Sequence, residues 1–90
     1  MNRTKLNIRM DLMRVAKTAL ELDIPFEEKI ANTFIDKAKL EFENNLKDDY
    51  DLENELISYQ TQIPSILDDS NKRLKWGEKI LTVASRLGTI

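Results

Sequence analysis

The sequence predicts an all-α fold, and two observations carry that prediction. Apolar residues recur at intervals of three and four along most of the 90-residue chain, which is the spacing of one face of a helix. Only two glycines and two prolines occur, which is fewer than the many turns of a β domain require. We therefore predict a small antiparallel bundle of four helices, or of three with a kink near Pro64, as one domain over residues 1–90. Residues 1–6 and 89–90 are expected to be frayed.

The dipeptide Ile24-Pro25 should separate the first two helices, because a residue before proline avoids the helical conformation whereas proline suits a first helical turn. The first helix is expected from about Asn7 to Leu22, with apolar residues around most of its circumference. The second is expected from near Pro25 to about Leu46, with Asp23 as a candidate N-cap. Its two apolar faces predict two packing partners.

A second dipeptide, Ile63-Pro64, divides the C-terminal half. A third helix is expected over 51–62, after a polar turn at 47–51. Pro64 then either begins a connecting turn or kinks a longer helix, and the sequence favours neither. The last helix has the clearest period: its N-cap is residue 69, 70 or 71, and Gly88 follows Leu87 where a left-handed residue often ends a helix.

Composition argues against an enzyme. The chain contains no cysteine and no histidine, which removes disulfides, the usual nucleophile and base pairs and most transition-metal sites. We expect no catalytic residue, no cofactor and no metal. The acidic run over 48–55 does not fit a calcium-binding EF-hand loop, because the sixth position counted from Asp49 is Asn54 where that loop needs glycine.

The pattern of the sequence predicts neither a signal peptide nor a membrane-spanning segment. Arg9, Asp11 and Arg14 interrupt the apolar residues near the N-terminus, and no apolar run approaches the 18 or so residues that a membrane helix needs. A cytoplasmic, soluble protein without membrane contact is the expectation.

Charge is unevenly distributed. The net charge is -2, yet five basic and one acidic residue give 1–20 a charge of +4, four basic and fourteen acidic residues give 21–69 a charge of -10, and five basic and one acidic residue give 70–90 a charge of +4. Four cations of the last helix fall on one stripe, which three cations of the first helix would join if the two helices lie side by side. These candidate contacts to an anion or a partner are Lys72, Lys75, Lys79, Arg86, Arg9, Arg14 and Lys17. The same stripe is also what an ordinary solvated helix face looks like.

The apolar helix surface exceeds what one copy of so small a chain can readily bury, and surplus apolar surface usually marks an interface. We therefore predict a homodimer, with the first two helices at the interface. The candidate interface residues are Met10, Met13, Leu20, Phe26, Ile30 and Leu40. Trp76 is interpreted as a core anchor for which Gly77 makes room, or else as a docking point for a partner.

The predicted function is a small non-enzymatic interaction or regulatory module that acts as a homodimer on an unidentified protein partner. The alternative is a nucleic-acid-binding accessory or regulatory protein that uses the basic terminal helices. Neither a helix-turn-helix glycine turn nor an RNA-binding aromatic motif occurs, so the alternative is not favoured.

Overall fold

The structure, a computed structural model, describes residues 3–45 and 50–88. It confirms the all-α prediction, since the described residues form five helices and no strand. These are α1 (Arg3–Leu20), α2 (Glu28–Asn45), α3 (Tyr50–Thr61), α4 (Ile63–Ile66) and α5 (Ser70–Gly88).

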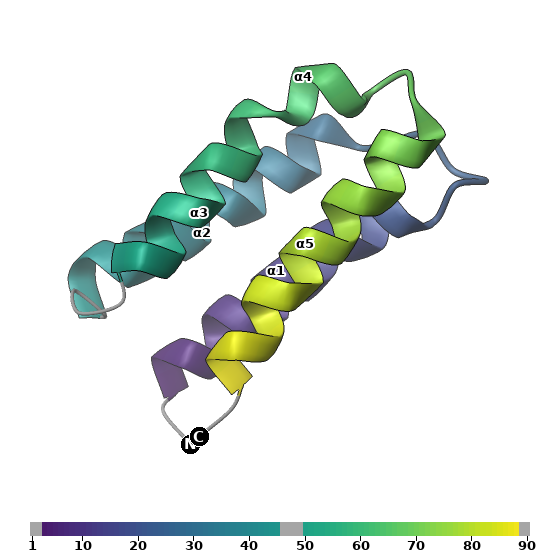
Figure 1. The fold of residues 1–90 in the computed structure, drawn as a ribbon. Coiled ribbons are helices and arrows are strands. Elements are labelled where there is room, and N and C mark those ends of the chain that lie inside the picture. Colours follow the sequence, from purple (N-terminus) through teal and green to yellow (C-terminus); the bar gives the residue numbers. More distant parts are fainter. Residues whose placement is uncertain (1–2, 46–49, 89–90) are drawn as a thin grey trace.

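The four long helices lie side by side, each running opposite to its neighbours (Figure 1). Helix α1 packs against α5 and α2, and α3 packs against α2 and α5, so each long helix contacts two others. The short α4 joins α3 to α5 across one end and contacts both. The terminal helices therefore do lie against each other, as the charge argument supposed.

The first two helices begin and end at other residues than predicted. Helix α1 already begins at Arg3, so residues 3–6 of the expected frayed segment are helical, and it ends at Leu20. Helix α2 begins at Glu28 rather than at Pro25. The Glu27 amide donates to the Thr18 hydroxyl oxygen at 3.0 Å, and this link to α1 holds the chain just before α2 begins. Because α2 begins at Glu28, Asp23 lies in the connection between the helices and cannot act as the N-cap of α2.

The helix limits in the C-terminal half are closer to the prediction. Helix α3 ends at Thr61, and Pro64 stands in the first turn of the separate α4. Pro64 therefore begins a connecting segment between α3 and α5 and does not kink one long helix. The Asp69 carboxylate accepts the Lys72 amide at 3.1 Å and so caps α5. No glycine among the described residues has a positive φ, so Gly88 does not form a left-handed cap. The predicted turn at 47–51 lies partly outside the described residues.

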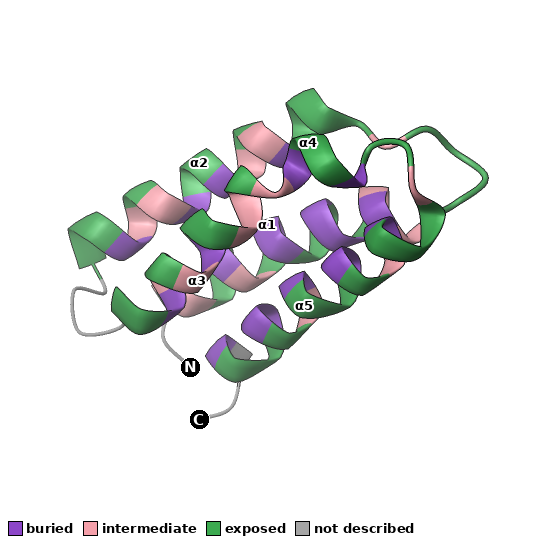
Figure 2. Cartoon of the chain, turned by 45° about the horizontal axis from the view of Figure 1, so that its top comes forward, coloured by how far each residue is buried: buried purple, intermediate pink, exposed green. Residues whose placement is uncertain are grey.

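The core lies between the four long helices, whose buried sides face inward in Figure 2. Trp76 and Phe42 are its largest fully buried side chains. The Trp76 indole donates to the Tyr59 carbonyl at 2.8 Å, which confirms its interpretation as a core anchor. A Cβ on Gly77 would lie 2.9 Å from the Leu20 side chain and 3.1 Å from the Ala19 Cβ, so the glycine brings α5 close to α1.

Candidate functional site

Among the described residues, the charged side chain with the most hydrogen bonds is that of Arg73, which sequence reasoning missed. Its residue is only 7% exposed. Its guanidinium donates to the carbonyl of Ala19 at 3.0 Å, of Thr18 at 2.9 Å, of Glu21 at 2.7 Å and of Ile24 at 2.5 Å. The last carbonyls of a helix lack partners within it and carry partial negative charge. Arg73 of α5 therefore caps the C-terminal end of α1 and holds the connection that follows.

An aromatic ring packs against the Arg73 guanidinium. Its central carbon lies 5.8 Å from the centre of the Phe26 ring. The Phe26 ring in turn meets Trp76 edge to face, with the ring centres 5.6 Å apart. A helical projection of α5 places Arg73 between Ile80 and Ala84, in the middle of the apolar arc. A cation at that place in a projection is the signal that would have identified it as buried and paired.

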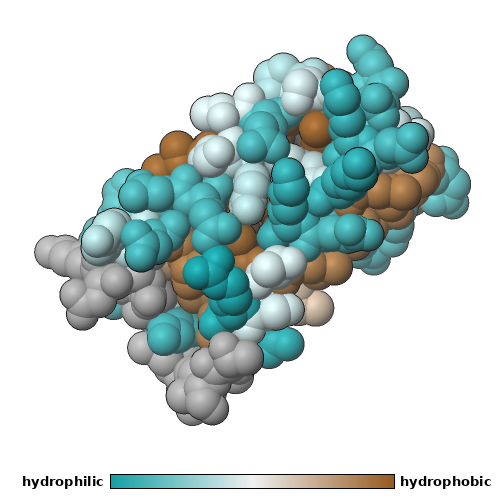
Figure 3. Space-filling model, viewed as in Figure 1, coloured by the Kyte–Doolittle hydropathy of each residue, from teal (hydrophilic) through white to brown (hydrophobic). Residues whose placement is uncertain are grey.

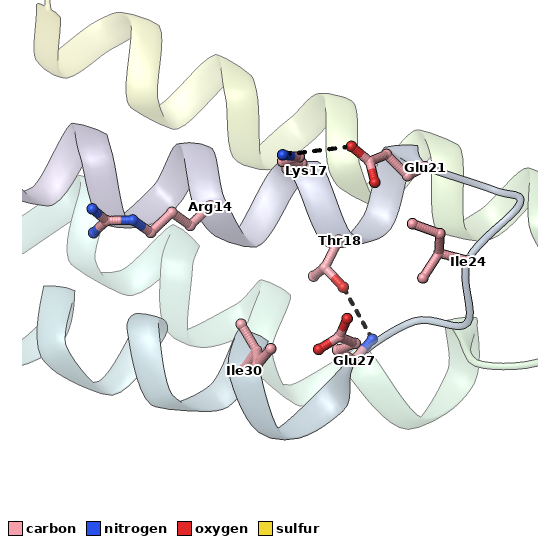
Figure 4. Close-up of a pocket in the computed structure, with 7 residues that line it drawn as sticks. All are labelled: Arg14, Lys17, Thr18, Glu21, Ile24, Glu27 and Ile30. Atoms are coloured by element: carbon pink, nitrogen blue, oxygen red, sulfur yellow. Dashed lines mark hydrogen bonds and ion pairs between the residues drawn. The ribbon is translucent and has the colours of Figure 1, made fainter.

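A groove follows the contact between α1 and α2, and it is made of two hollows that share Arg14. One, of about 270 Å³, is closed by the connection between the helices (Figure 4). It is lined by Arg14, Lys17, Thr18, Glu21, Ile24, Glu27 and Ile30. The other, of about 300 Å³, is lined by Asn7, Met10, Asp11, Arg14, Lys37 and Glu41. We call these residues together the α1–α2 groove.

Asp11 is the buried carboxylate of the α1–α2 groove. Burial raises its pKa above the ordinary value of 3.8, against the opposing effects of Lys37 and Arg14, while Glu41 adds to the increase. Its side chain, 12% exposed, forms an ion pair with Arg14 at 3.1 Å. A single carboxylate of this kind lacks a second acid or base, because the groove holds no other buried titratable group among the described residues.

The residues predicted for a dimer interface fall into two groups. Met10, Met13, Ile30 and Leu40 are exposed, with exposed fractions between 40% for Ile30 and 58% for Leu40. Leu20 and Phe26 are half-buried and pack against the core. These two side chains therefore contribute to the core of a single chain.

The cations predicted on α5 divide in the same way. Lys72, Lys75 and Lys79 line a hollow of about 150 Å³ together with residues of α4 and Trp76. Arg86 does not join them, because its guanidinium forms an ion pair with Glu55 of α3. On the face drawn in Figure 3, hydrophilic side chains cover most of α3 and α5 and break the hydrophobic areas into separate patches.

The predicted cations of α1 do not line the hollow that the lysines of α5 line. Arg14 lies 5.2 Å from the centre of the Phe34 ring of α2, and Lys17 pairs with Glu21 at 3.8 Å. Arg9 is half-buried. None of the hollows described here brings together cations of α1 and α5. The two basic helices are neighbours, but Arg14 and Lys17 line one hollow and the three lysines of α5 line another.

Tyr59 of α3 lies beside the cations of α5. Its hydroxyl donates to the Glu55 carboxylate at 3.1 Å, and the Lys79 ammonium lies 5.9 Å from its ring centre. Burial, followed by the hydrogen bond to Glu55, raises the pKa of Tyr59 above 10.0. The hydroxyl therefore stays protonated at neutral pH, where it orients Glu55 toward Arg86.

Within 3–45 and 50–88, no three carboxylates lie close enough together to hold a metal ion; Asp48 and Asp49 of the acidic run fall outside these ranges. No helix among the described residues has the length and apolarity to cross a membrane. Comparison of the chain with protein-family models, with curated proteins and with solved structures finds no match.

Proposed function

We propose that this chain is a small non-enzymatic interaction module that acts as a homodimer through the outer sides of α1 and α2. One observation carries the proposal. Ten large hydrophobic side chains are exposed among the described residues, and seven of them belong to α1, α2 and the connection between them. Exposed apolar side chains gathered on neighbouring elements usually mark an interface.

Charge in the α1–α2 groove supports a second copy of the same chain as the occupant. The groove carries three cations, Arg14, Lys17 and Lys37. It also carries the acidic side chains Glu21, Glu27, Glu41 and Asp11. An interface between two copies related by a two-fold axis must complement itself, which a surface of mixed sign permits. A nucleic acid would instead require a surface of predominantly positive charge.

The area required is modest for this chain. A stable protein interface covers about 800 Å² on each partner, roughly a seventh of the 5587 Å² of accessible surface. Each of the two helices has 18 residues and is therefore about 27 Å long. Two such helices side by side supply enough surface for an interface of ordinary size.

Sedimentation equilibrium tests the proposal. At tens of micromolar the wild-type protein should have twice the 10.5 kDa mass of the chain. Met10→Lys and Leu40→Lys each place a charge on the proposed interface and should weaken dimerisation by at least about tenfold. Ile57→Lys is the matched control, because Ile57 is an exposed apolar residue of α3, outside the interface.

Two results would contradict this assignment. A wild-type monomer at these concentrations would remove the dimer. A dimer weakened by Ile57→Lys but not by Met10→Lys would place the interface on another side of the molecule. Far-ultraviolet circular dichroism of each variant shows that the fold is kept.

A further inference from the structure

We propose that the hollow between α4 and α5 is a binding site for the phosphoryl group of a small phosphorylated molecule. The hollow, here called the α4–α5 pocket, has a volume of about 150 Å³. Its lining residues are Gln62, Ser65, Ile66, Lys72, Lys75, Trp76 and Lys79. It is independent of the α1–α2 groove and of the proposed dimer.

The sign of its charge separates the α4–α5 pocket from the other hollows described in this structure. Its only charged lining residues are Lys72, Lys75 and Lys79. Both hollows of the α1–α2 groove, and the two that lie around Leu40, contain cations and carboxylates together. Three ammonium groups without a carboxylate among them favour an anionic ligand.

The three ammonium groups are also available to a ligand. None of them forms an ion pair with a described carboxylate, and the one contact that involves a charge is that of Lys79 with the Tyr59 ring. By contrast, Arg86 of the same helix is held by Glu55. Lys72, Lys75 and Lys79 therefore present their positive charge to whatever enters the pocket.

Gln62 adds donors that suit the oxygen atoms of a phosphoryl group. The Gln62 side-chain amide makes no hydrogen bond within the described residues, so its two N–H donors are free. The Ser65 hydroxyl donates its single hydrogen to the Gln62 carbonyl at 2.7 Å, so it would have to rotate away from that acceptor before it could donate to a ligand. Charge-assisted hydrogen bonds from ammonium groups are the strong contacts that such a dianion forms.

Size decides between a small group and a large ligand. Pockets that enclose a whole drug-sized molecule have volumes from about 300 Å³ upward. The α4–α5 pocket is half of that lower limit. It can therefore take a phosphoryl group and leave the rest of the molecule outside, which makes a free phosphate and a phosphate monoester the two sources to compare.

The experiment uses the single tryptophan of the chain, because Trp76 lines the pocket. Inorganic phosphate and O-phosphoserine are titrated into the whole protein at constant ionic strength, while Trp76 fluorescence is followed. Broadening of the phosphorus-31 resonance measures the same binding without relying on the tryptophan. We expect a saturable response to both probes. Tighter binding of phosphoserine would identify a monoester as the natural ligand, and equal binding would identify the phosphoryl group alone.

Variants locate the site. Lys72→Gln and Lys75→Gln each remove one ammonium group and should weaken phosphate binding at least about tenfold. Lys29→Gln is the control: it makes the same change of charge at an exposed position of α2, away from the pocket. All three positions are exposed, so circular dichroism should show unchanged folding.

Three results would overturn the site. The first is the absence of any saturable response to either probe. The second is equal weakening by Lys75→Gln and Lys29→Gln, because that would mean a nonspecific effect of net charge. The third is duplex DNA that binds through Lys72 and Lys75 while neither small probe saturates, because that would make this surface part of a nucleic-acid interface.

Discussion

The contact between α1 and α5 and the contact between α2 and α3 differ in the polar groups that bridge the two helices. Between α1 and α5, the small residues Ala19 and Gly77 bring the helices together, and Arg73, the one buried cation among the described residues, is satisfied by backbone carbonyls. Between α2 and α3 the bridging groups are partly exposed and polar. Gln60 donates to Asn32 at 3.1 Å and to Asp36 at 3.0 Å, and accepts from Lys39 at 2.9 Å.

The difference teaches where the stability of the fold resides. Buried contacts lose their partners completely when they are cut, whereas partly exposed polar groups turn to water instead. We therefore expect substitutions between α1 and α5 to lower the free energy of unfolding much more than substitutions between α2 and α3. Three predictions test that ranking, beginning with the largest effect.

Arg73→Met should be the most damaging single change, lowering the free energy of unfolding by about 3 kcal/mol or more. Methionine fills similar space but leaves the carbonyls of Thr18, Ala19 and Ile24 without the guanidinium donor. Arg73→Lys should recover only a small part of the loss, because one ammonium group cannot reproduce the fork of guanidinium donors. Urea denaturation measures both variants.

Lys75→Met is the control for Arg73→Met, since it removes the same charge from an exposed position of α5. It should change the free energy of unfolding by less than about 0.5 kcal/mol. Equal losses for the two variants would mean that net charge, and not the cap on α1, accounts for the effect.

Gly77→Val should cost about 2 kcal/mol, because its side chain would enter the space held by Leu20 and Ala19. Gly77→Ala should cost less, since alanine favours a helix over glycine by about 1 kcal/mol and offsets part of the crowding. Thermal and urea unfolding of the series measure the trend. A stabilised Gly77→Val protein would contradict the close approach of α5 to α1.

Gln60→Ala should lower the free energy of unfolding by about 1 kcal/mol, in spite of the three hydrogen bonds that it removes. Its partners Asn32, Asp36 and Lys39 are exposed or half-buried and can be hydrated. The comparison with Arg73→Met is the direct test, measured under the same denaturant conditions. A loss for Gln60→Ala as large as that for Arg73→Met would show that the two contacts do not differ in strength.

Periodicity and local rules were sufficient for the elements but not for the pairing between them. The proline at 64 and the acceptor at Asp69 act through their immediate neighbours, so the sequence could place a helix boundary and a cap there. Asp23 failed as a cap because Thr18, on another helix, holds the chain before α2. That contact depends on tertiary structure, which rules based on neighbouring residues do not describe.

The candidate sites were predictable to the same extent. A helical projection placed Lys72, Lys75 and Lys79 on one stripe because they share one helix, and the three line one hollow. It could not show that Arg86 pairs with Glu55 of α3, or that Arg73 turns inward to the end of α1. These outcomes depend on which helix lies opposite, and that is fixed only when the four long helices pack.

Asp11 provides the smallest and most selective test, at the contact between α1 and α2. Burial raises its pKa, so the folded state holds the Asp11 proton more tightly than the unfolded state does. Its contribution to stability is therefore fully present below about pH 3.8 and is lost as the pH rises through the higher pKa of the folded state. Asp11→Asn mimics the protonated form. The free energy of unfolding of this variant should therefore increase, relative to that of the wild type, as the pH increases from 3 to 7. We expect that change to stay below about 1 kcal/mol, because Arg14 and Lys37 oppose the effect of burial.

Urea denaturation of both proteins from pH 3 to pH 7 measures this change, and the wild-type curve corrects for the other carboxylates. A variant that becomes less favourable toward pH 7 would mean that the ion pair with Arg14 outweighs burial, and the contact between α1 and α2 would then be held by charge.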